Sequence, residues 1–279
     1  MIEQLFHAVL NYPFLTRAFI VGILVALCAA LLGVNLVLKN YSLIGDGLSH
    51  VGFGAIAIAS AANLAPLAVA IPVVVAAAFV LLRLRESAGV RGDSAIALIS
   101  TASLALGCVV SSRAGANTDL SGYLFGSILS LSRTDLWLSV ALCGIVLVLF
   151  VFFYNKLFAV TFDETFARAT GTHTGLYNTL LAVLTAVTVV LGMRLMGTLL
   201  ISSLIIFPSL SAMRVCHNFR SVVLTSAAVS ILCVLMGLSA SYLFDLPAGA
   251  SVVIVNIAVF ALACAAAFFT KHLAGMKKA

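Results

Sequence analysis

Two side chains that can bind a divalent cation stand four residues apart in a stretch without other charges. Asp46 and His50 lie within residues 41–54, whose remaining side chains are apolar or small, apart from Tyr41. On a helix this spacing puts both side chains on one face, about 5 to 6 Å apart at Cβ. A carboxylate and an imidazole are ligands for zinc, and for manganese in an oxygen-rich shell. The spacing therefore predicts a site for a divalent transition-metal ion.

The composition places this pair in a membrane. Of the 279 residues, 63% are apolar and 9% are charged, whereas about a quarter of the residues of a soluble domain are charged. This excludes a water-soluble globular protein, and the continuously apolar runs favour an all-α polytopic membrane protein over a barrel. The net charge of +6 comes without a basic stripe, so no nucleic-acid partner is expected.

Asp46 and His50 also have a purely structural interpretation, as a helix-start acid and a packing histidine bonded to each other across one turn. Ionisable groups inside a membrane bundle are costly and usually mark a substrate or proton path, which favours the functional interpretation. The glycines of this segment allow close helix contact or a locally unwound turn; they are Gly45, Gly47, Gly52 and Gly54.

Apolar runs between polar breaks predict nine membrane spans, or eight if residues 175–213 form one broken or re-entrant helix. The expected spans are 14–38, 45–61, 64–84, 94–112, 134–156, 175–193, 197–213, 221–243 and 249–271. Alternating loops put eleven of the fifteen Lys and Arg residues on one face, which the positive-inside rule makes cytoplasmic. The amino terminus is then outside and the carboxyl terminus inside. Residues 1–279 form one membrane domain, with 1–13 as an amphipathic lead-in on the outer side.

The segment 157–174, between the fifth and sixth spans, is expected to carry a short cytoplasmic helix. Thr161 and Glu164 have the spacing of a capping box. Asp163 and Glu164 complement the positive end of the helix dipole, and Gly171 suits the position just beyond the helix end.

This short helix has the character of a docking element. Phe162 and Phe166 share a face at a spacing of four residues. A helix that lies among lipid headgroups usually carries several basic residues, whereas here Arg168 stands alone against two acids. We therefore expect the helix to dock on a protein.

Two further places are candidates for a pathway lining or an outer gate. Ser202 and Ser203 precede Pro208, whose ring removes a helix hydrogen bond, so these hydroxyls either line a pathway or satisfy backbone groups. Asp245 joins the last two spans, where it either forms a turn or attracts a cation or a delivering protein.

Four blocks of the chain carry a family resemblance by their order and spacing. They are residues 45–50, 121–126, 162–168, and 196–208 followed by 245–249. In these blocks the chain resembles the permease subunits of bacterial zinc/manganese ABC importers. The resemblance implies a type II ABC importer-like permease in the bacterial inner membrane. It pairs with a second copy and works with a cytoplasmic ATPase dimer and an extracytoplasmic metal-binding protein.

The resemblance also assigns roles to residues. Asp46 and His50 match the acid and histidine of the translocation path, and residues 162–168 match the segment that contacts the ATPase. The expected function is ATP-driven import of a divalent ion, zinc first and manganese second. ATP hydrolysis is expected on the partner subunit, because this chain has no Walker-type phosphate loop. The alternative is a proton-coupled secondary transporter that uses Asp46 and His50 as a relay.

Overall fold

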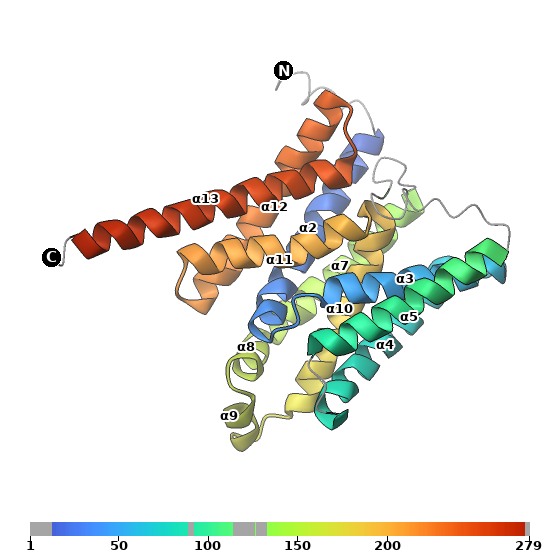
Figure 1. Cartoon of the computed structure of the whole chain (residues 1–279), viewed down its shortest axis with the longest axis horizontal. Helices are drawn as coiled ribbons and strands as arrows, with labels where there is room; N and C mark the ends of the chain where they lie inside the picture. The colour runs from blue at the N-terminus through green and yellow to red at the C-terminus, as the bar shows by residue number, and fades with distance from the viewer. Residues whose placement is uncertain (1–12, 89–91, 114–125, 127–132, 277–279) are drawn as a thin grey trace.

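The computed structural model of the chain describes residues 13–88, 92–113, 126 and 133–276, and every regular element among them is an α-helix (Figure 1). The expected lead-in, 1–13, lies outside the described residues except for Pro13. The helices are α2 (Pro13–Leu38), α3 (Ile44–Ala61), α4 (Pro66–Ala88), α5 (Gly92–Arg113), α7 (Arg133–Phe152), α8 (Tyr154–Phe162), α9 (Glu164–Ala169), α10 (Thr174–Met196), α11 (Thr198–Val215), α12 (Phe219–Phe244) and α13 (Ala248–Met276).

Each expected span coincides with a helix, but not every helix is long and apolar enough to cross a membrane unaided. Seven pass by length and composition among the described residues, and an eighth is gained if a bent pair counts as one span. In α4 the apolar part is shorter, Pro66–Leu81. The all-helical membrane fold is confirmed, and the count of eight or nine spans stays a prediction.

The pattern of apolar residues did not establish two helix boundaries, one within the fifth span and one within residues 175–213. The fifth span ends in a bend of 69° between α7 and α8, so α8 extends six residues beyond the expected end of that span. Residues 175–213 form two helices, because Gly197, with φ of 87°, ends α10 and begins α11 directly. An L side chain rarely adopts this backbone conformation, which explains the glycine.

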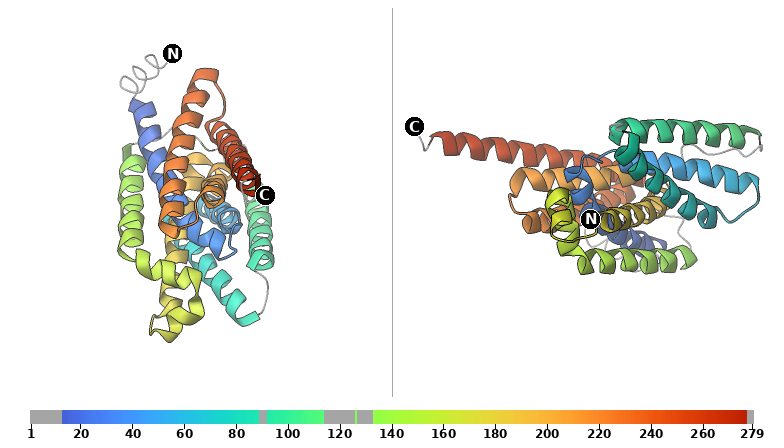
Figure 2. Two further views of the ribbon diagram at one scale, coloured as in Figure 1. Left: turned by 90° about the vertical axis from the view of Figure 1, so that its left-hand side faces the viewer. Right: turned by 90° about the horizontal axis from the view of Figure 1, so that it is seen from below.

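The helices pack around α2. Helix α2 contacts α11, α12, α7 and α10, while α3 lies against α5 and α4 and also reaches α10 and α11. Helix α13 contacts α11 and α12 and then runs out from the bundle toward the carboxyl end (Figures 1 and 2). The helix that carries Asp46 and His50 is therefore enclosed by four neighbours.

Helices α2 and α11 lie in close contact at Gly33. A Cβ at this position would lie 2.2 Å from the carbonyl oxygen of Ile205 and 2.7 Å from Oγ of Ser209. Both residues are buried, so the contact leaves no room for a side chain on α2.

We expect Gly33→Ala to destabilise the protein because it forces α2 away from the α11 backbone, with a cost of about 1–3 kcal/mol for such overpacking. The measurement is the midpoint of thermal unfolding in detergent. Gly144→Ala on α7 is the matched control, since nothing lies within 4 Å of its Cβ position. Equal midpoints for the two variants would contradict the close contact.

Candidate functional site

The structure brings Asp46 and His50 together at the start of α3. Asp46 lies in the first turn of the helix, and His50 follows one turn later. Nε2 of His50 is 3.6 Å from Oδ2 of Asp46. The Asp46 side chain is 51% exposed and that of His50 is 19% exposed, so the pair opens to the surface of a single chain and is not sealed in its core.

This distance fits two ligands of one ion. Two atoms that each bind a tetrahedral ion at about 2.1 Å lie about 3.4 Å apart. Within the described residues, no group of three or more His, Cys, Asp and Glu side chains could hold a metal ion. One copy of the described chain thus offers two ligands of these types, and water or a second copy would have to supply the rest.

Glycines fix the first turn of α3 between two neighbouring helices. A Cβ at Gly45 would lie 2.7 Å from Cδ1 of Ile205 and 3.7 Å from Cα of Ser202, both on α11. A Cβ at Gly47 would lie 2.4 Å from Cγ2 of Ile96 on α5. The backbone around Asp46 is therefore held on both sides by direct contact.

Ser202 and Ser203 hydrogen-bond to the backbone of their own helix, α11. Oγ of Ser202 donates to the carbonyls of Thr198 and Leu199, at 3.0 and 3.2 Å. Oγ of Ser203 donates to Leu200 at 2.9 Å. The Cα of Ser202 would lie 3.7 Å from a Cβ at Gly45, so Ser202 stands next to the residue that precedes Asp46.

Pro208 and Asp245 have clear local roles. Pro208 is buried within α11, where its ring removes one helix hydrogen bond. Asp245 ends α12 in the left-handed conformation, with φ of 52°, and is exposed. Next to it, Oγ of Ser241 donates to the carbonyl of Leu246 at 2.6 Å. A turn thus explains Asp245, and its role as an outer gate stays a prediction.

The expected capping box at Thr161 is wrong. Asp163 has an extended backbone, with φ of −146°, and separates α8 from α9. Oδ1 of Asp163 caps α9 by accepting from the backbone N–H of Phe166 at 2.8 Å. Thr161 remains in α8, where its hydroxyl donates to Oδ1 of the buried Asn35 at 2.9 Å. The N-cap thus lies two residues later than expected, at Asp163, and the short helix begins at Glu164.

Helix α9 presents an exposed surface. Phe162 and Phe166 are both 66% exposed, although Phe162 belongs to α8 and its ring lies 5.1 Å from that of Phe158. The Arg168 side chain is 74% exposed and contacts Oε1 of Glu164 at 3.4 Å. Gly171 follows the helix with φ of 81°, as expected for the residue beyond a helix end.

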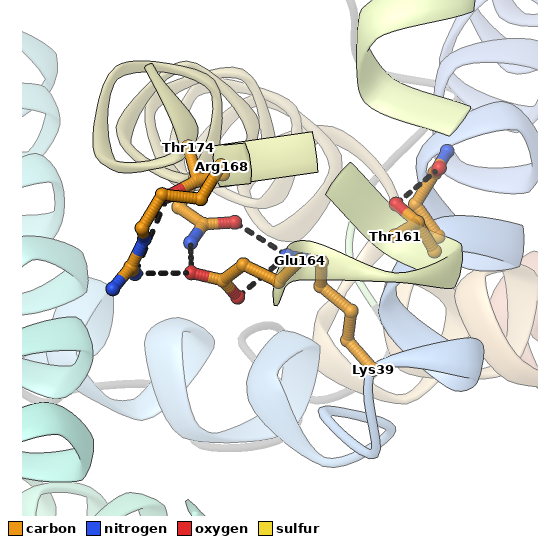
Figure 3. A network of polar contacts seen from close by, with 7 residues as sticks. Lys39, Thr161, Glu164, Arg168 and Thr174 are labelled. Atoms are coloured by element: carbon orange, nitrogen blue, oxygen red, sulfur yellow. Dashed lines mark hydrogen bonds and ion pairs between the residues drawn. The ribbon is translucent and has the colours of Figure 1, made fainter. Parts of the chain in front are cut away.

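A polar network ties α9 to α2 and α10 (Figure 3). Nζ of Lys39 lies 3.9 Å from Oε2 of Glu164 and donates to Oδ1 of Asn178. Nδ2 of Asn178 donates to Oε1 of Glu164 at 3.2 Å. Lys39 is one of the eleven basic residues that the sequence analysis placed on the expected cytoplasmic face, and Asn178 had no predicted role. No local pattern joins residues this far apart in the chain.

Two of the blocks noted in the sequence meet at Gly126, which has φ of 69°. A Cβ there would lie 2.2 Å from the carbonyl carbon of Met196 and 2.4 Å from the nitrogen of Gly197. Gly126, the last residue of the 121–126 block, therefore packs directly on the join between α10 and α11.

Comparisons with known proteins extend over nearly the whole chain. The chain is 28% identical over 260 residues to the manganese import system permease protein ScaB of Streptococcus gordonii, covering 93% of this chain and 94% of the relative. It is 30% identical over 259 residues to the manganese transport system membrane protein MntC of Halalkalibacterium halodurans, covering 92% and 89%.

Solved structures show the same fold. PsaBC from Streptococcus pneumoniae, solved in complex with Fab, matches with a TM-score of 0.84 and 29% identity over 94% of this chain and 95% of that chain. A metal-chelate type ABC transporter in an inward-facing conformation matches with a TM-score of 0.67 and 16% identity over 91% and 89%, which supports the fold alone. Residues 11–267 match the ABC 3 transport family, and the chain belongs to this family of membrane permeases.

Proposed function

We propose that this chain is the membrane permease subunit of an ATP-driven importer of divalent transition-metal ions. The observation that carries the proposal is the Asp46–His50 pair, 3.6 Å apart on one face of α3, in a chain of the ABC 3 transport family. Membership of an ABC family favours an ATP-driven cycle over the proton-coupled alternative.

Manganese is the first ion to test. The relatives ScaB and MntC are named as proteins of a manganese import system and a manganese transport system, and manganese accepts a mixed shell of carboxylate, imidazole and water. The two ligand types also suit zinc, which stays the second candidate.

The pair suits passage of an ion better than its storage. A conducted ion must bind well enough to enter and weakly enough to leave. One carboxylate and one imidazole per copy, completed by water or by a second copy, meet this requirement. The exposure of the Asp46 side chain at the surface of one chain leaves that carboxylate accessible to an ion.

Two exposed surfaces, one on α9 and one at the Asp46–His50 pair, suggest two of the proposed partners. The exposed Phe166 and its neighbours on α9 would dock on a cytoplasmic ATPase dimer, and a second permease copy would face the Asp46–His50 pair. An extracytoplasmic metal-binding protein would deliver the ion to the opposite side. Lys39 and Arg168 both contact Glu164 at the start of α9, and this gathering of cations supports a cytoplasmic location for this end by the positive-inside rule.

In the proposed cycle, ATP-driven closure of the ATPase moves α9 and the helices attached to it. Asp46 would hold the ion by charge and direct ligation, and His50 would add a neutral nitrogen ligand. The chain itself hydrolyses nothing, so its work is to position these two side chains and to move them relative to the membrane.

We expect Asp46→Asn and His50→Gln each to reduce manganese uptake into proteoliposomes by more than about tenfold, because supporting residues around a metal alone are worth about 10- to 100-fold in affinity. The assay uses the permease reconstituted with its ATPase and radioactive manganese. His173→Gln, at an exposed position before α10, is the control and should transport normally. Wild-type uptake by either variant of the pair would contradict the metal path.

We expect Phe166→Ala to weaken binding of the ATPase by about thirtyfold, as truncation of an aromatic anchor does at other interfaces, with no change in permease stability. The measurement is the dissociation constant of the purified subunits. Phe244→Ala is the matched control, since Phe244 is 68% exposed at the far end of α12. Equal affinities for both variants would remove α9 from the interface.

We expect uptake to require ATP inside the proteoliposomes and to persist when an ionophore collapses the proton gradient. Transport couples to hydrolysis on the partner subunit, so a proton gradient adds no driving force. Uptake without ATP that ceases with the ionophore would instead establish the proton-coupled relay.

A further inference from the structure

Lys39 occupies an unusual position for a lysine that follows an apolar helix. Its side chain is 9% exposed, although a cation at a helix end ordinarily reaches into water. Burial of an ammonium group is unfavourable unless it is paired and hydrogen-bonded. The pairing is supplied by Glu164 at 3.9 Å and by Oδ1 of Asn178.

The three side chains close a ring that involves three separate helices. Asn178 donates to the same carboxylate that faces Lys39, so α10, the first residue of α9 and the end of α2 meet at one point (Figure 3). One turn earlier on α2, Asn35 accepts from Thr161 at 2.9 Å. Helices α8 and α9 are therefore attached to one face of α2 at two successive turns.

Lys39 is also joined to the candidate metal site by a very short piece of chain. Only residues 39–43 separate α2 from α3. This turn is closed by backbone bonds from Tyr41 to Leu36 at 2.8 Å and from Ile44 to Tyr41 at 3.1 Å. Tyr41 is 5% exposed, so a buried side chain and two backbone bonds hold the turn that links Lys39 to the first turn of α3.

We propose that Lys39 is a positioning residue, which transmits movement of α9 to the Asp46–His50 pair through its contacts with Glu164 and Asn178. The proposal rests on the proposed function for its biological meaning, since it assumes that an ATPase moves α9. It assigns to Lys39 a role in transport without contact with the ion.

The test monitors the start of α3 directly in the complex of permease and ATPase. Leu43, 48% exposed and next to α3, is replaced by Cys and labelled with an environment-sensitive fluorophore, after Cys108, Cys216 and Cys264 have been replaced by serine. ATP should change the fluorescence in the otherwise native complex. This readout requires no knowledge of which ion is carried.

We expect Lys39→Met to reduce the ATP-dependent signal by about tenfold, within the range of energies that couple contacting residues, while the ATPase rate stays within about twofold. Lys39→Arg retains the charge and should retain the signal. The double variant Lys39→Met with Glu164→Gln removes both members of the Lys39–Glu164 pair, and it should lose no more signal than Lys39→Met alone. Lys156→Met, at an exposed position on α8, should behave as the parent complex.

Two results would overturn the proposal. One is a full ATP-dependent signal in Lys39→Met, and the other is a proportional fall of signal, ATPase rate and folded yield, which indicates a purely structural lysine. Manganese uptake by the same samples separates the two proposals. Suppose that the parent complex does not take up manganese but that Lys39→Met still abolishes its ATP-dependent signal. The positioning role of Lys39 would then be supported, and manganese as the transported ion would be rejected.

Discussion

The arrangement depends on the close approach of neighbouring helices to the backbone of α3. In lipid, helices associate through van der Waals packing and interhelical bonds, because the surroundings are as apolar as their side chains. At Gly45 and Gly47 the contacts are made by side chains of α11 and α5. At Gly54 a Cβ would lie 2.7 Å from the carbonyl oxygen of Ser103. These small residues allow close contact at defined points, and that contact fixes the position of the helix that carries the two ionisable side chains.

Much of the fold was readable from the sequence, because the length of an apolar run sets the length of a membrane helix. The Asp46–His50 contact was equally local, since four residues of spacing on a helix determine it. The bend between α7 and α8 was not readable, because Phe152, Phe153 and Tyr154 include neither proline nor glycine. At the bend, Phe153 packs against Tyr177 and Tyr154 against Phe219, which are contacts with distant helices that no local pattern reveals.

The docking segment shows where local rules fail. Thr161 has the spacing of a cap, yet its hydroxyl bonds to Asn35, 126 residues away in the chain. Lys39 and Asn178 are separated by 139 residues, and neither carries a local signal for the other. Local propensity therefore located the short helix, whereas the polar contacts that orient it arise from the tertiary fold.

The direct join between α10 and α11 has a consequence for how this chain tolerates insertions and deletions. Gly197 alone lies between the two helices, so the join has no slack to absorb an added residue. Each residue added to a helix rotates the rest of that helix by about 100°, which would turn Ile205 and Ser202 away from Gly45. The number of residues between α10 and α11 is thus constrained. In relatives of different length, we expect insertions and deletions to lie outside this join.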